Sequence, residues 1–424
     1  ALPNNKEAHE TASKVRSEWV ISATGIVNKR PEKMIAKDKV TGEIEPNGDI
    51  ELELKSVEVL NEAQTPPIDV RSDGKEIGED ARLKFRYLDL RRPRLQKNIR
   101  NRSKVTLAVR NAFVKEGFTE IETPYMSATT PEGSRDYVVP SRLENGKFYS
   151  LPQSPQQYKQ LLMTAGFERY FQFARCFRDE DTRGDRQPEF TQMDMEMSFV
   201  QMRDVMAINE KIMIETVKSI YPEKVIQEIP FPIMSYKEVM EKYGVDKPDI
   251  RKDKNDNNLL AFLWVIDWPF FEKDEDGKWT FTHNPFSAPQ PQHMQDLMEK
   301  KNIENILTTQ YDMVLNGSEV AGGSIRNHRP EALKKVFEIM GYEDERIEKN
   351  FGHMISALGS GTPPHGGIAW GFDRLIMLLE NEPNIREVIA FAKTGEGKDL
   401  MMGAPSDIPE KQMRELGIEL RKKK

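Results

Sequence analysis

The sequence predicts an α+β fold in which a mostly antiparallel sheet is flanked by helices. Short runs that alternate apolar and polar residues, typical of strands with one buried face, recur along the 424-residue chain. Segments with helical spacing and capping residues lie between them. The two kinds of segment do not alternate regularly, as they would around a doubly wound parallel sheet. A group of strand patterns at the N-terminus predicts a small separate β domain.

The first elements are two strands. Residues 19–27 and 50–60 alternate apolar and polar positions, and a turn-rich stretch separates them. The alternation slips by one position at Lys55 and Ser56, which predicts a β-bulge. A polar stretch rich in proline, glycine and acidic residues follows. We therefore predict three regions: a small β domain (1–63), a linker (64–95) and a larger second domain (96–424).

Composition limits the class of protein. The chain is 38% hydrophobic and 31% charged, which is enough for a real core and too apolar for wholesale disorder. Its single cysteine, Cys176, excludes a disulfide framework and a cysteine-based zinc site, and is typical of a reducing compartment such as the cytoplasm. The longest apolar run, 259–266, is too short to span a bilayer, so we expect no membrane association. The net charge of −7 neither indicates nor excludes a nucleic-acid partner.

The second domain opens with a basic helix. Val105, Val109 and Phe113 recur at helical spacing and form one apolar face, and Gly117 is typical of a helix end.

Two strand patterns, at 169–178 and 190–199, enclose a densely charged loop, and together they predict a long hairpin. The phenylalanines of the first strand share a core face, whereas Gln192, Asp194, Glu196 and Ser198 share an unusually polar face of the second. If the strands pair, the side chains of Arg178, Gln192 and Asp194 lie together on one face of the sheet, below the loop. The simpler alternative is a solvated hairpin at the edge of the sheet.

Residues 154–166 predict a capped helix. Ser154 is expected at the N-cap, Pro155 at the first helical position, Gln157 at the capping-box position and Gly166 after the end. Gln156 and Lys159 then lie three residues apart on one face. The positive helix end and the lysine favour an anionic ligand, although an ordinary capped helix with a surface lysine is the better explanation of this stretch alone.

Asn316-Gly317 predicts a tight turn between two further strands. Pairing outward from this turn sets Val314 opposite Glu319 and Met313 opposite Val320, which brings Asp312 and Glu319 onto one face. Two such carboxylates can share Mg²⁺, or can simply pair with lysine or arginine.

Two glycines and a final strand follow this hairpin. Gly322 and Gly323 are expected to admit a ligand close to the backbone and to change the strand phase before Arg326. A last strand leads through Gly371, placed for close approach, into a helix near Asp373 that carries Arg374 in its first turn, a position suited to phosphate.

Together these stretches resemble the class II aminoacyl-tRNA synthetases, and within them the bacterial-type aspartyl-tRNA synthetases. "GFTEIETPYM", "CFRDEDTRGDRQPEFTQMDMEMSF" and "GIAWGFDRLIML" resemble the three motifs of the class, in the expected order. "TPEGSRDYVVPSR", "LPQSPQQYKQLL", "HNPFSAP" and "GSEVAGGSIR" resemble the signatures of the aspartate family, so the resemblance covers nearly the whole chain.

The resemblance implies an ATP site. Arg178 would hold the α-phosphate and the substrate α-carboxylate, Arg374 the γ-phosphate, and the corner at Glu180 would share in catalysis. Asp312 and Glu319 match the magnesium-binding acids of the family. The full set of residues implied for ATP is Arg178, Asp179, Glu180, Gln187, Glu319, Gly371, Phe372, Asp373 and Arg374.

The resemblance also implies an aspartate site. Lys159 and Arg326 would bind the side-chain carboxylate, with Asp194 positioning them and His283 closing over the site. Glu132, Ser154 and Gln156 would orient the substrate, mainly through its ammonium group.

The implied function is ATP-dependent activation of L-aspartate to aspartyl-adenylate, followed by transfer to tRNA(Asp), by a cytoplasmic homodimer that uses Mg²⁺. One alternative is a non-discriminating enzyme that also charges tRNA(Asn), and another is a synthetase-like tRNA-binding protein without catalysis. An asparagine synthetase on the same fold is disfavoured, since it would not need the N-terminal domain and its linker.

The sequence departs from the family pattern in several places. The usual insertion between the second and third motifs is expected to be lacking, and residues 1–63 resemble only part of an OB-fold anticodon-binding barrel, whose first half should lie upstream. Ala321 stands where a third glycine is usual, and Asn284 where a second histidine is common, which leaves the substrate contact of that loop open.

Overall fold

The structure is a computed structural model that describes residues 5–37, 44, 47–129 and 133–421. Contacts between residues divide the chain into two compact units, Ala1–Arg92 and Pro93–Lys424. No helix among the described residues has the length and apolar character needed to cross a membrane.

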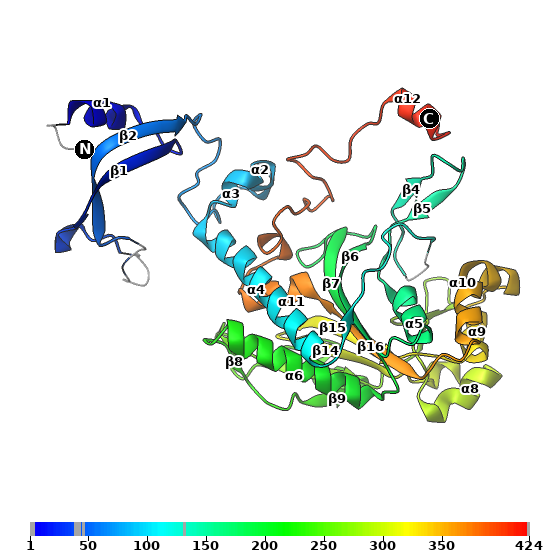
Figure 1. Cartoon of the computed structure of the whole chain (residues 1–424). Coiled ribbons are helices and arrows are strands. Elements are labelled where there is room, and N and C mark those ends of the chain that lie inside the picture. The colour runs from blue at the N-terminus through cyan, green and yellow to red at the C-terminus, as the bar shows by residue number, and fades with distance from the viewer. Residues whose placement is uncertain (1–4, 38–43, 45–46, 130–132, 422–424) are drawn as a thin grey trace. The chain divides into compact units, whose positions relative to one another are not determined.

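The N-terminal unit is built on a two-stranded antiparallel ribbon (Figure 1). Its elements are α1 (Lys6–Lys14), β1 (Val20–Lys29), η1 (Glu32–Met34), β2 (Ile50–Asn61), α2 (Glu79–Lys84) and α3 (Arg86–Asp89). Thr24 pairs with Ser56 and Gly25 with Leu54, so Lys55 is left without a partner residue. The predicted bulge is therefore confirmed. Helix α1 was not predicted, and the stretch interpreted as a linker contains α2 and α3.

A buried carboxylate joins the two short helices of this unit. Asp89 is fully buried and accepts hydrogen bonds from Arg82 Nε at 3.0 Å, Arg86 Nη1 at 2.7 Å and Arg92 Nε at 2.6 Å. Burial acts to raise the pKa of Asp89, but its arginine partners, Arg82 and Arg92 first, lower it below the ordinary value. The cluster fixes the segment that precedes the second unit.

The second unit is organised around an eight-stranded sheet in the order β3-β6-β7-β16-β15-β14-β11-β9. All neighbouring strands are antiparallel except β3 with β6 and β11 with β9, which confirms the predicted sheet. Its strands are β3 (Thr119–Glu120), β6 (Arg169–Phe177), β7 (Glu189–Ser198), β9 (Ile233–Ser235), β11 (Phe262–Ile266), β14 (Gln310–Leu315), β15 (Ser318–Ile325) and β16 (His365–Gly371). Separate two-stranded sheets are formed by β4 (Val138–Pro140) with β5 (Phe148–Ser150), β8 (Val225–Ile226) with β10 (Leu259–Leu260), and β12 (Phe271–Lys273) with β13 (Trp279–Phe281).

Helices flank this sheet (Figure 1). The helices of the second unit are α4 (Pro93–Lys115), α5 (Gln156–Thr164), α6 (Met202–Ile220), α7 (Tyr236–Tyr243), α8 (Met294–Glu299), α9 (Pro330–Ile339), α10 (Asp344–Leu358), α11 (Phe372–Leu379) and α12 (Glu410–Glu415), with 3₁₀ turns η2 (Pro291–His293), η3 (Ile303–Asn305) and η4 (Ile385–Glu387). Figure 1 shows α12 away from the sheet.

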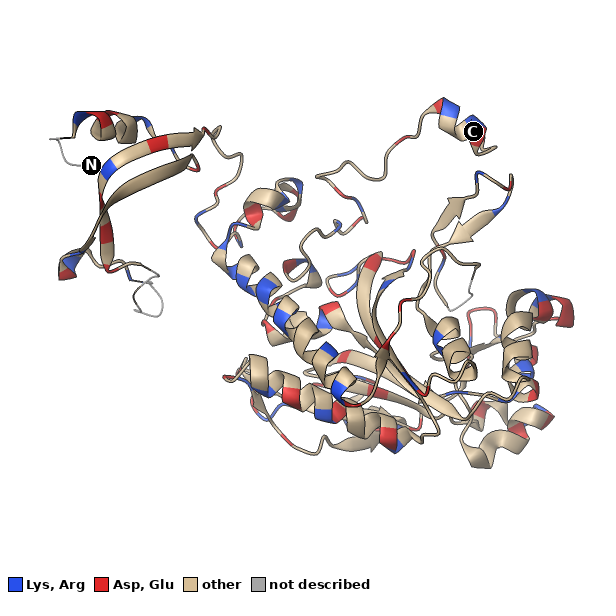
Figure 2. Cartoon of the chain, viewed as in Figure 1, with Lys and Arg blue, Asp and Glu red and all other residues tan. Residues whose placement is uncertain are grey.

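Helices α4 and α6 cover the apolar face of the sheet. Val105, Val109 and Phe113 of α4 are fully buried as predicted, and Phe113 stacks on Phe171 with 5.1 Å between ring centroids. Gly117 ends the turn after α4 with a φ of +81°, where glycine is favoured. Lysines and arginines are spread along α4, which makes it the basic helix expected (Figure 2). The opposite, polar face of the sheet is left for the site.

Candidate active site

The charged loop lies above an interior part of the sheet. Strands β6 and β7 pair with Gln172 opposite Asp194 and Ala174 opposite Gln192, and β7 also pairs with β16. The hairpin prediction is confirmed, and the alternative of a solvated edge hairpin is wrong. The Arg178 amide donates to the Pro188 carbonyl at 2.8 Å, which closes the base of the loop. Gln192 and Asp194 are buried below it.

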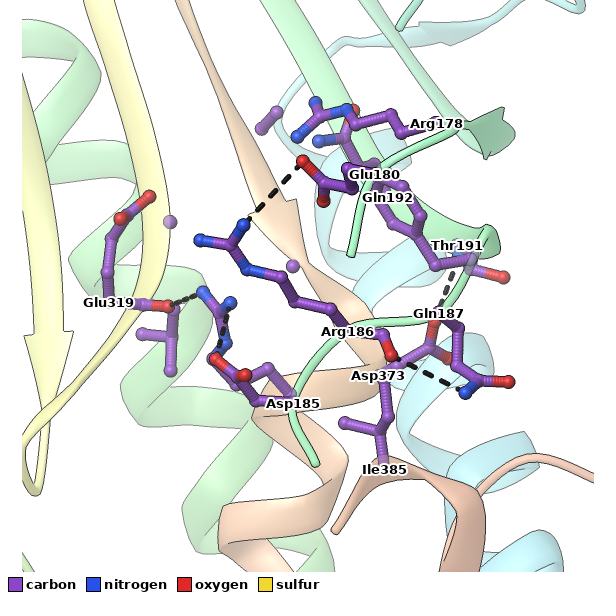
Figure 3. A pocket seen from close by; sticks show the side chains of 16 residues that line it. Arg178, Glu180, Asp185, Arg186, Gln187, Thr191, Gln192, Glu319, Asp373 and Ile385 are labelled. Atoms are coloured by element: carbon purple, nitrogen blue, oxygen red, sulfur yellow. Dashed lines mark hydrogen bonds and ion pairs between the residues drawn. The ribbon is translucent and has the colours of Figure 1, made fainter. Parts of the chain in front are cut away.

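A pocket opens between this loop and the start of α11 (Figure 3). Arg374, in the first turn of α11, donates to the Glu319 carbonyl at 2.5 Å and to Asp185 Oδ2 at 3.0 Å. Arg186 lies 3.6 Å from Glu180, so the loop presents charges of both signs to the pocket. The lining residues are Arg178, Glu180, Asp185, Arg186, Gln187, Phe190, Thr191, Gln192, Glu319, Val320, Ala321, Ala369, Gly371, Asp373, Arg374 and Ile385.

Seven of the nine residues implied for ATP line this pocket: Arg178, Glu180, Gln187, Glu319, Gly371, Asp373 and Arg374. Of the other two, Asp179 pairs with Arg135 at 3.5 Å, and Phe372 is buried in the core. Asp373 accepts from the Thr191 amide at 2.9 Å, so it also holds the start of α11 against β7.

Arg178 lies at the mouth of the hairpin. Its Nε donates to the Gln153 carbonyl at 3.3 Å, and its guanidinium lies 5.0 Å from the ring centroid of Phe190. This arrangement leaves a cation and an aromatic face in the same pocket, which are groups that suit a phosphate and a planar base.

The hairpin formed by β14 and β15 follows the predicted register for only two residue pairs. Leu315 faces Ser318 and Val314 faces Glu319, but Met313 then faces Ala321 rather than Val320. The prediction for Met313 is wrong because a bulge at Val320 shifts the register by one residue. The strand phase therefore changes before the glycines, and not at Gly322-Gly323 as expected.

The bulge still brings the two predicted metal-binding acids together. A Cβ placed on Gly322 would lie 2.9 Å from Asp312 Oδ1 and 3.5 Å from Glu319 Oε1, so both carboxylates converge above this glycine. Burial and the charge of Asp312 raise the pKa of Glu319. Two crowded carboxylates of this kind fit a divalent cation that keeps water or phosphate oxygens as its other ligands.

His283 and Gln310 complete the surroundings of this carboxylate pair. His283 Nε2 lies 3.1 Å from Asp312 Oδ2, and Gln310 Nε2 donates to Asp312 Oδ1 at 2.7 Å. Burial acts to lower the pKa of His283, but Asp312 more than offsets this effect and the pKa is raised. Among the described residues, no cluster of three or more acidic, histidine or cysteine side chains is arranged as a metal site, so the protein offers two carboxylates rather than a full cage.

A network of buried charges lies farther along the same sheet face. Lys159 Nζ is 2.7 Å from Asp194 Oδ2 and 3.3 Å from Glu196 Oε2, and all three side chains are at most 1% exposed. Arg326 forms two hydrogen bonds with Glu196, of 2.9 and 3.2 Å, and donates to Ser324 Oγ at 2.8 Å. Two cations and two carboxylates are thus held out of water.

The two carboxylates of this network differ. Burial raises the pKa of Asp194 despite the opposing effect of Lys159, whereas the charges of Arg326 and Lys159 outweigh burial and lower the pKa of Glu196. Asp194 Oδ1 is buried and has no hydrogen-bond partner among the residues that the structure describes. Asp194 was predicted to have a positioning role, whereas Glu196 was not predicted as a site residue. Its place on the same polar strand face was the available signal.

Helix α5 begins one residue later than predicted. Pro155 occupies the N-cap position, and Ser154 Oγ accepts from the Gln156 amide at 3.3 Å. The capping box is wrong because the side chain of Gln157 lies 2.6 Å from His353 Nε2 instead. Gln156 and Lys159 nevertheless share the buried face toward the sheet, as predicted.

The floor of the site is packed backbone against backbone. A Cβ on Gly323 would lie 2.1 Å from the Gly367 carbonyl oxygen, and one on Gly367 would lie 2.0 Å from Glu196 Oε2. The Gly367 carbonyl accepts from Tyr311 and from Arg326. At Gly371, by contrast, a Cβ would meet protein atoms only at 3.7 Å or more, and the residue lines the pocket, so close approach of a ligand there stays a prediction.

The remaining predicted residues lie near the site or outside the described part. Asn284 Oδ1 accepts from the Phe286 amide at 2.9 Å and shapes the loop after His283. Ala321 is buried and lines the pocket. Glu132 lies outside the described residues.

Known proteins resemble this chain in sequence. Residues 78–395 match the family model described as tRNA synthetases class II (D, K and N). The chain is 37% identical over 545 aligned residues to the Aspartate--tRNA(Asp/Asn) ligase of Desulfatibacillum aliphaticivorans, covering 99% of this chain and 89% of that protein. It is also 37% identical over 531 residues to the Aspartate--tRNA(Asp) ligase of Deinococcus radiodurans, covering 98% and 90%. Both alignments are longer than this chain, so they contain positions where it has no residue.

Solved structures share the fold. The asparaginyl-tRNA synthetase from Pyrococcus horikoshii, complexed with asparaginyl-adenylate, aligns with a TM-score of 0.68 and 19% identity over 91% of this chain and 85% of that one. The aspartyl tRNA synthetase from Entamoeba histolytica aligns with a TM-score of 0.67 and 22% identity over 90% and 79%. The family model covers well over half of this chain, and the relatives match nearly all of it. The chain belongs to the class II tRNA synthetases of the D, K and N family.

Proposed function

We propose that the chain is an aspartate-activating enzyme that forms aspartyl-adenylate from L-aspartate and ATP and transfers the aspartyl group to tRNA(Asp). The observation that carries the proposal is the pair of buried cations, Lys159 and Arg326, on a sheet face that continues into the pocket beside Arg178 and Arg374. Two cations suit the side-chain carboxylate of aspartate, while the pocket suits a triphosphate. The relatives named as aspartate ligases support the same assignment.

The first step needs little proton transfer. An oxygen of the aspartate α-carboxylate attacks the α-phosphorus of ATP, and the bond to the bridging oxygen breaks as pyrophosphate leaves. Arg178 is placed at the mouth of the hairpin to hold the α-phosphate, and Arg374 to hold the γ-phosphate. Their contribution is alignment of the reacting groups and stabilisation of the charge that develops. In the second step a hydroxyl of the terminal ribose of the tRNA attacks the carbonyl carbon, and AMP leaves.

Asp312 and Glu319 are proposed to hold Mg²⁺ with the phosphates. The cation, when bound, neutralises phosphate charge and favours departure of pyrophosphate. The two carboxylates converge above Gly322, where an added Cβ would lie 2.9 Å from Asp312 Oδ1, and would hold the cation at that point.

The charge network also explains the choice of aspartate. Lys159 and Arg326 are each held by a carboxylate, and an amide substrate would leave their remaining donors short of a charged partner in a buried site. A site built for a charged or hydrogen-bonding group rejects an analogue that lacks it by large factors. Asparagine should therefore be a poor substrate for activation.

Several finer features belong to the same proposal. We propose a cytoplasmic homodimer, an anticodon-binding role for residues 1–63 and catalysis by residues 96–424. Because some relatives are named for both tRNA(Asp) and tRNA(Asn), charging of both is the second candidate function.

The experiment is ATP–pyrophosphate exchange by the purified chain with each of the twenty amino acids, followed by charging of purified tRNA(Asp) and tRNA(Asn). Exchange with aspartate alone, and charging of tRNA(Asp), are expected. Exchange with no amino acid by a folded protein would contradict the proposal and favour a non-catalytic binding protein. Charging of tRNA(Asn) with aspartate would establish the second candidate.

A further inference from the structure

Three buried side chains form a chain of hydrogen bonds that ends at the substrate side of α5. His365 Nδ1 lies 2.8 Å from the Pro363 carbonyl, and its Nε2 lies 3.1 Å from Gln160 Nε2. Gln156 Nε2 in turn donates to Gln160 Oε1 at 3.0 Å. His365 and Gln160 are fully buried, and Gln156 is 7% exposed. His365 was not predicted as a site residue.

The donor and acceptor of each hydrogen bond in this series follow from the bond between His365 and the Pro363 carbonyl. A carbonyl oxygen can only accept, so Nδ1 of His365 carries the proton. Burial lowers the pKa of His365, so the ring is neutral near pH 7 and Nε2 presents a lone pair. Gln160 must therefore point its amide nitrogen at the ring and its carbonyl oxygen at Gln156.

The orientation of the Gln156 side-chain amide follows in the same way. Its amide nitrogen donates to Gln160, so its carbonyl oxygen is the group left over. Among the described residues none donates a hydrogen bond to that oxygen. A glutamine amide otherwise has two orientations of nearly equal shape, one of which would present a second donor in the same place.

We propose that His365 is a positioning residue, which acts through Gln160 to hold Gln156 with its carbonyl oxygen toward the ammonium group of the bound amino acid. The inference rests on the proposed function, in which Gln156 meets that ammonium group. An ammonium group can only donate, so it binds the carbonyl orientation and is repelled by the other. His365 itself is fixed at the start of β16, where its own carbonyl accepts from the Arg326 amide at 2.9 Å.

The test compares aspartate with succinate, which has the same carbon skeleton and both carboxylates but no amino group. In His365→Phe the ring is kept and both nitrogens are lost, so Gln160 and Gln156 are free to turn. The KM for aspartate in ATP–pyrophosphate exchange should rise about tenfold or more, the effect of losing a hydrogen bond to a charged group. The KM for ATP and the inhibition constant of succinate should stay within about twofold of the unmodified enzyme, a selectivity that general disturbance of the site would not produce.

A second variant and a control guard against misfolding. Gln160→Met removes the middle link at similar length and should show the same selective loss. His353→Phe removes a histidine that contacts Gln157 of α5. This control should leave the KM for aspartate and the inhibition constant of succinate unchanged. In a Gln156→Glu background both side-chain oxygens accept, so adding His365→Phe should raise the KM for aspartate less than it does alone.

The outcomes separate the inference from the proposed function. If aspartate and succinate weaken equally, or if neither variant changes the KM for aspartate, the positioning role is overturned. If the unmodified enzyme shows no exchange with aspartate, or binds succinate as tightly as aspartate, the result contradicts the proposed contact with the ammonium group, on which the role of His365 depends.

Discussion

Replacing Lys159 with methionine tests the buried charge network most directly. Methionine keeps the length of the side chain but removes the ammonium group that lies 2.7 Å from Asp194 and 3.3 Å from Glu196. Glu196 retains Arg326, whereas Asp194 is left buried with no charged partner in contact among the described residues. Breaking a buried pair in this way costs about 3–5 kcal/mol of unfolding free energy. Aspartate activation should be lost as well.

The effect should depend on pH with a definite sign. The pKa of Asp194 is already raised above its ordinary value of 3.8, chiefly by burial, and loss of Lys159 removes a charge that lowers it. The folded state then binds a proton that the unfolded state has released, so the stability of the variant falls as pH rises above that ordinary value. The deficit relative to the unmodified protein should therefore be smaller at pH 5 than at pH 8.

A matched double variant separates stability from function. Lys159→Met with Asp194→Asn removes both partners and should recover most of the lost stability, while aspartate activation stays absent. The assays are urea unfolding at pH 5 and pH 8, and ATP–pyrophosphate exchange with aspartate. Unchanged unfolding together with near-normal exchange in the single variant would refute the reasoning.

Three further predictions concern other charges. Glu319→Gln should raise the Mg²⁺ concentration needed for pyrophosphate exchange more than tenfold. The melting temperature should stay equal or rise, because the substitution relieves repulsion with Asp312. A Mg²⁺ titration that matches the unmodified enzyme would refute this prediction. Arg374→Ala should raise the KM for ATP about tenfold to a hundredfold, as expected for losing a contact between charged groups, with the KM for aspartate as the internal control. Asp89→Asn should cost about 3–5 kcal/mol at neutral pH by leaving three arginines without their shared carboxylate. Since the pKa of Asp89 is lowered, its contribution is present above pH 3.8 and is lost as pH falls through the lowered value, so unfolding of the two proteins should converge in acid.

Much of the fold could be predicted because alternation and turn residues are local signals. The pairing of β6 with β7 followed from two faces of opposite character, and the bulge at Lys55 from a slip in the alternation. The bulge at Val320 gave no such signal, because Ala321, Gly322 and Gly323, which follow it, are small and show no alternation. Register near a bulge is decided by packing against neighbouring strands, which a single sequence does not contain.

The site, like the fold, could be predicted only in part. Residue types suited to phosphate and carboxylate could be identified along the chain, and most of the nucleotide residues line one pocket. The partners that hold them could not, since Glu196 meets Arg326 only when β7 and β15 are joined through β16. The hydrogen bonds that link Gln156 to His365 likewise join residues more than two hundred positions apart in the chain.

The glycine floor of the site limits how the enzyme can be altered. Positions 323 and 367 have no space for even a methyl group, since its nearest contacts are backbone oxygens and the Glu196 carboxylate. A library that seeks a different amino-acid substrate gains nothing from varying these positions, and each substitution there would disturb the sheet itself. Useful diversity is confined to the walls, where side chains from α5 and from the loop that carries His283 can change size or charge. The substrate range can thus be altered from the sides of the site but not from below.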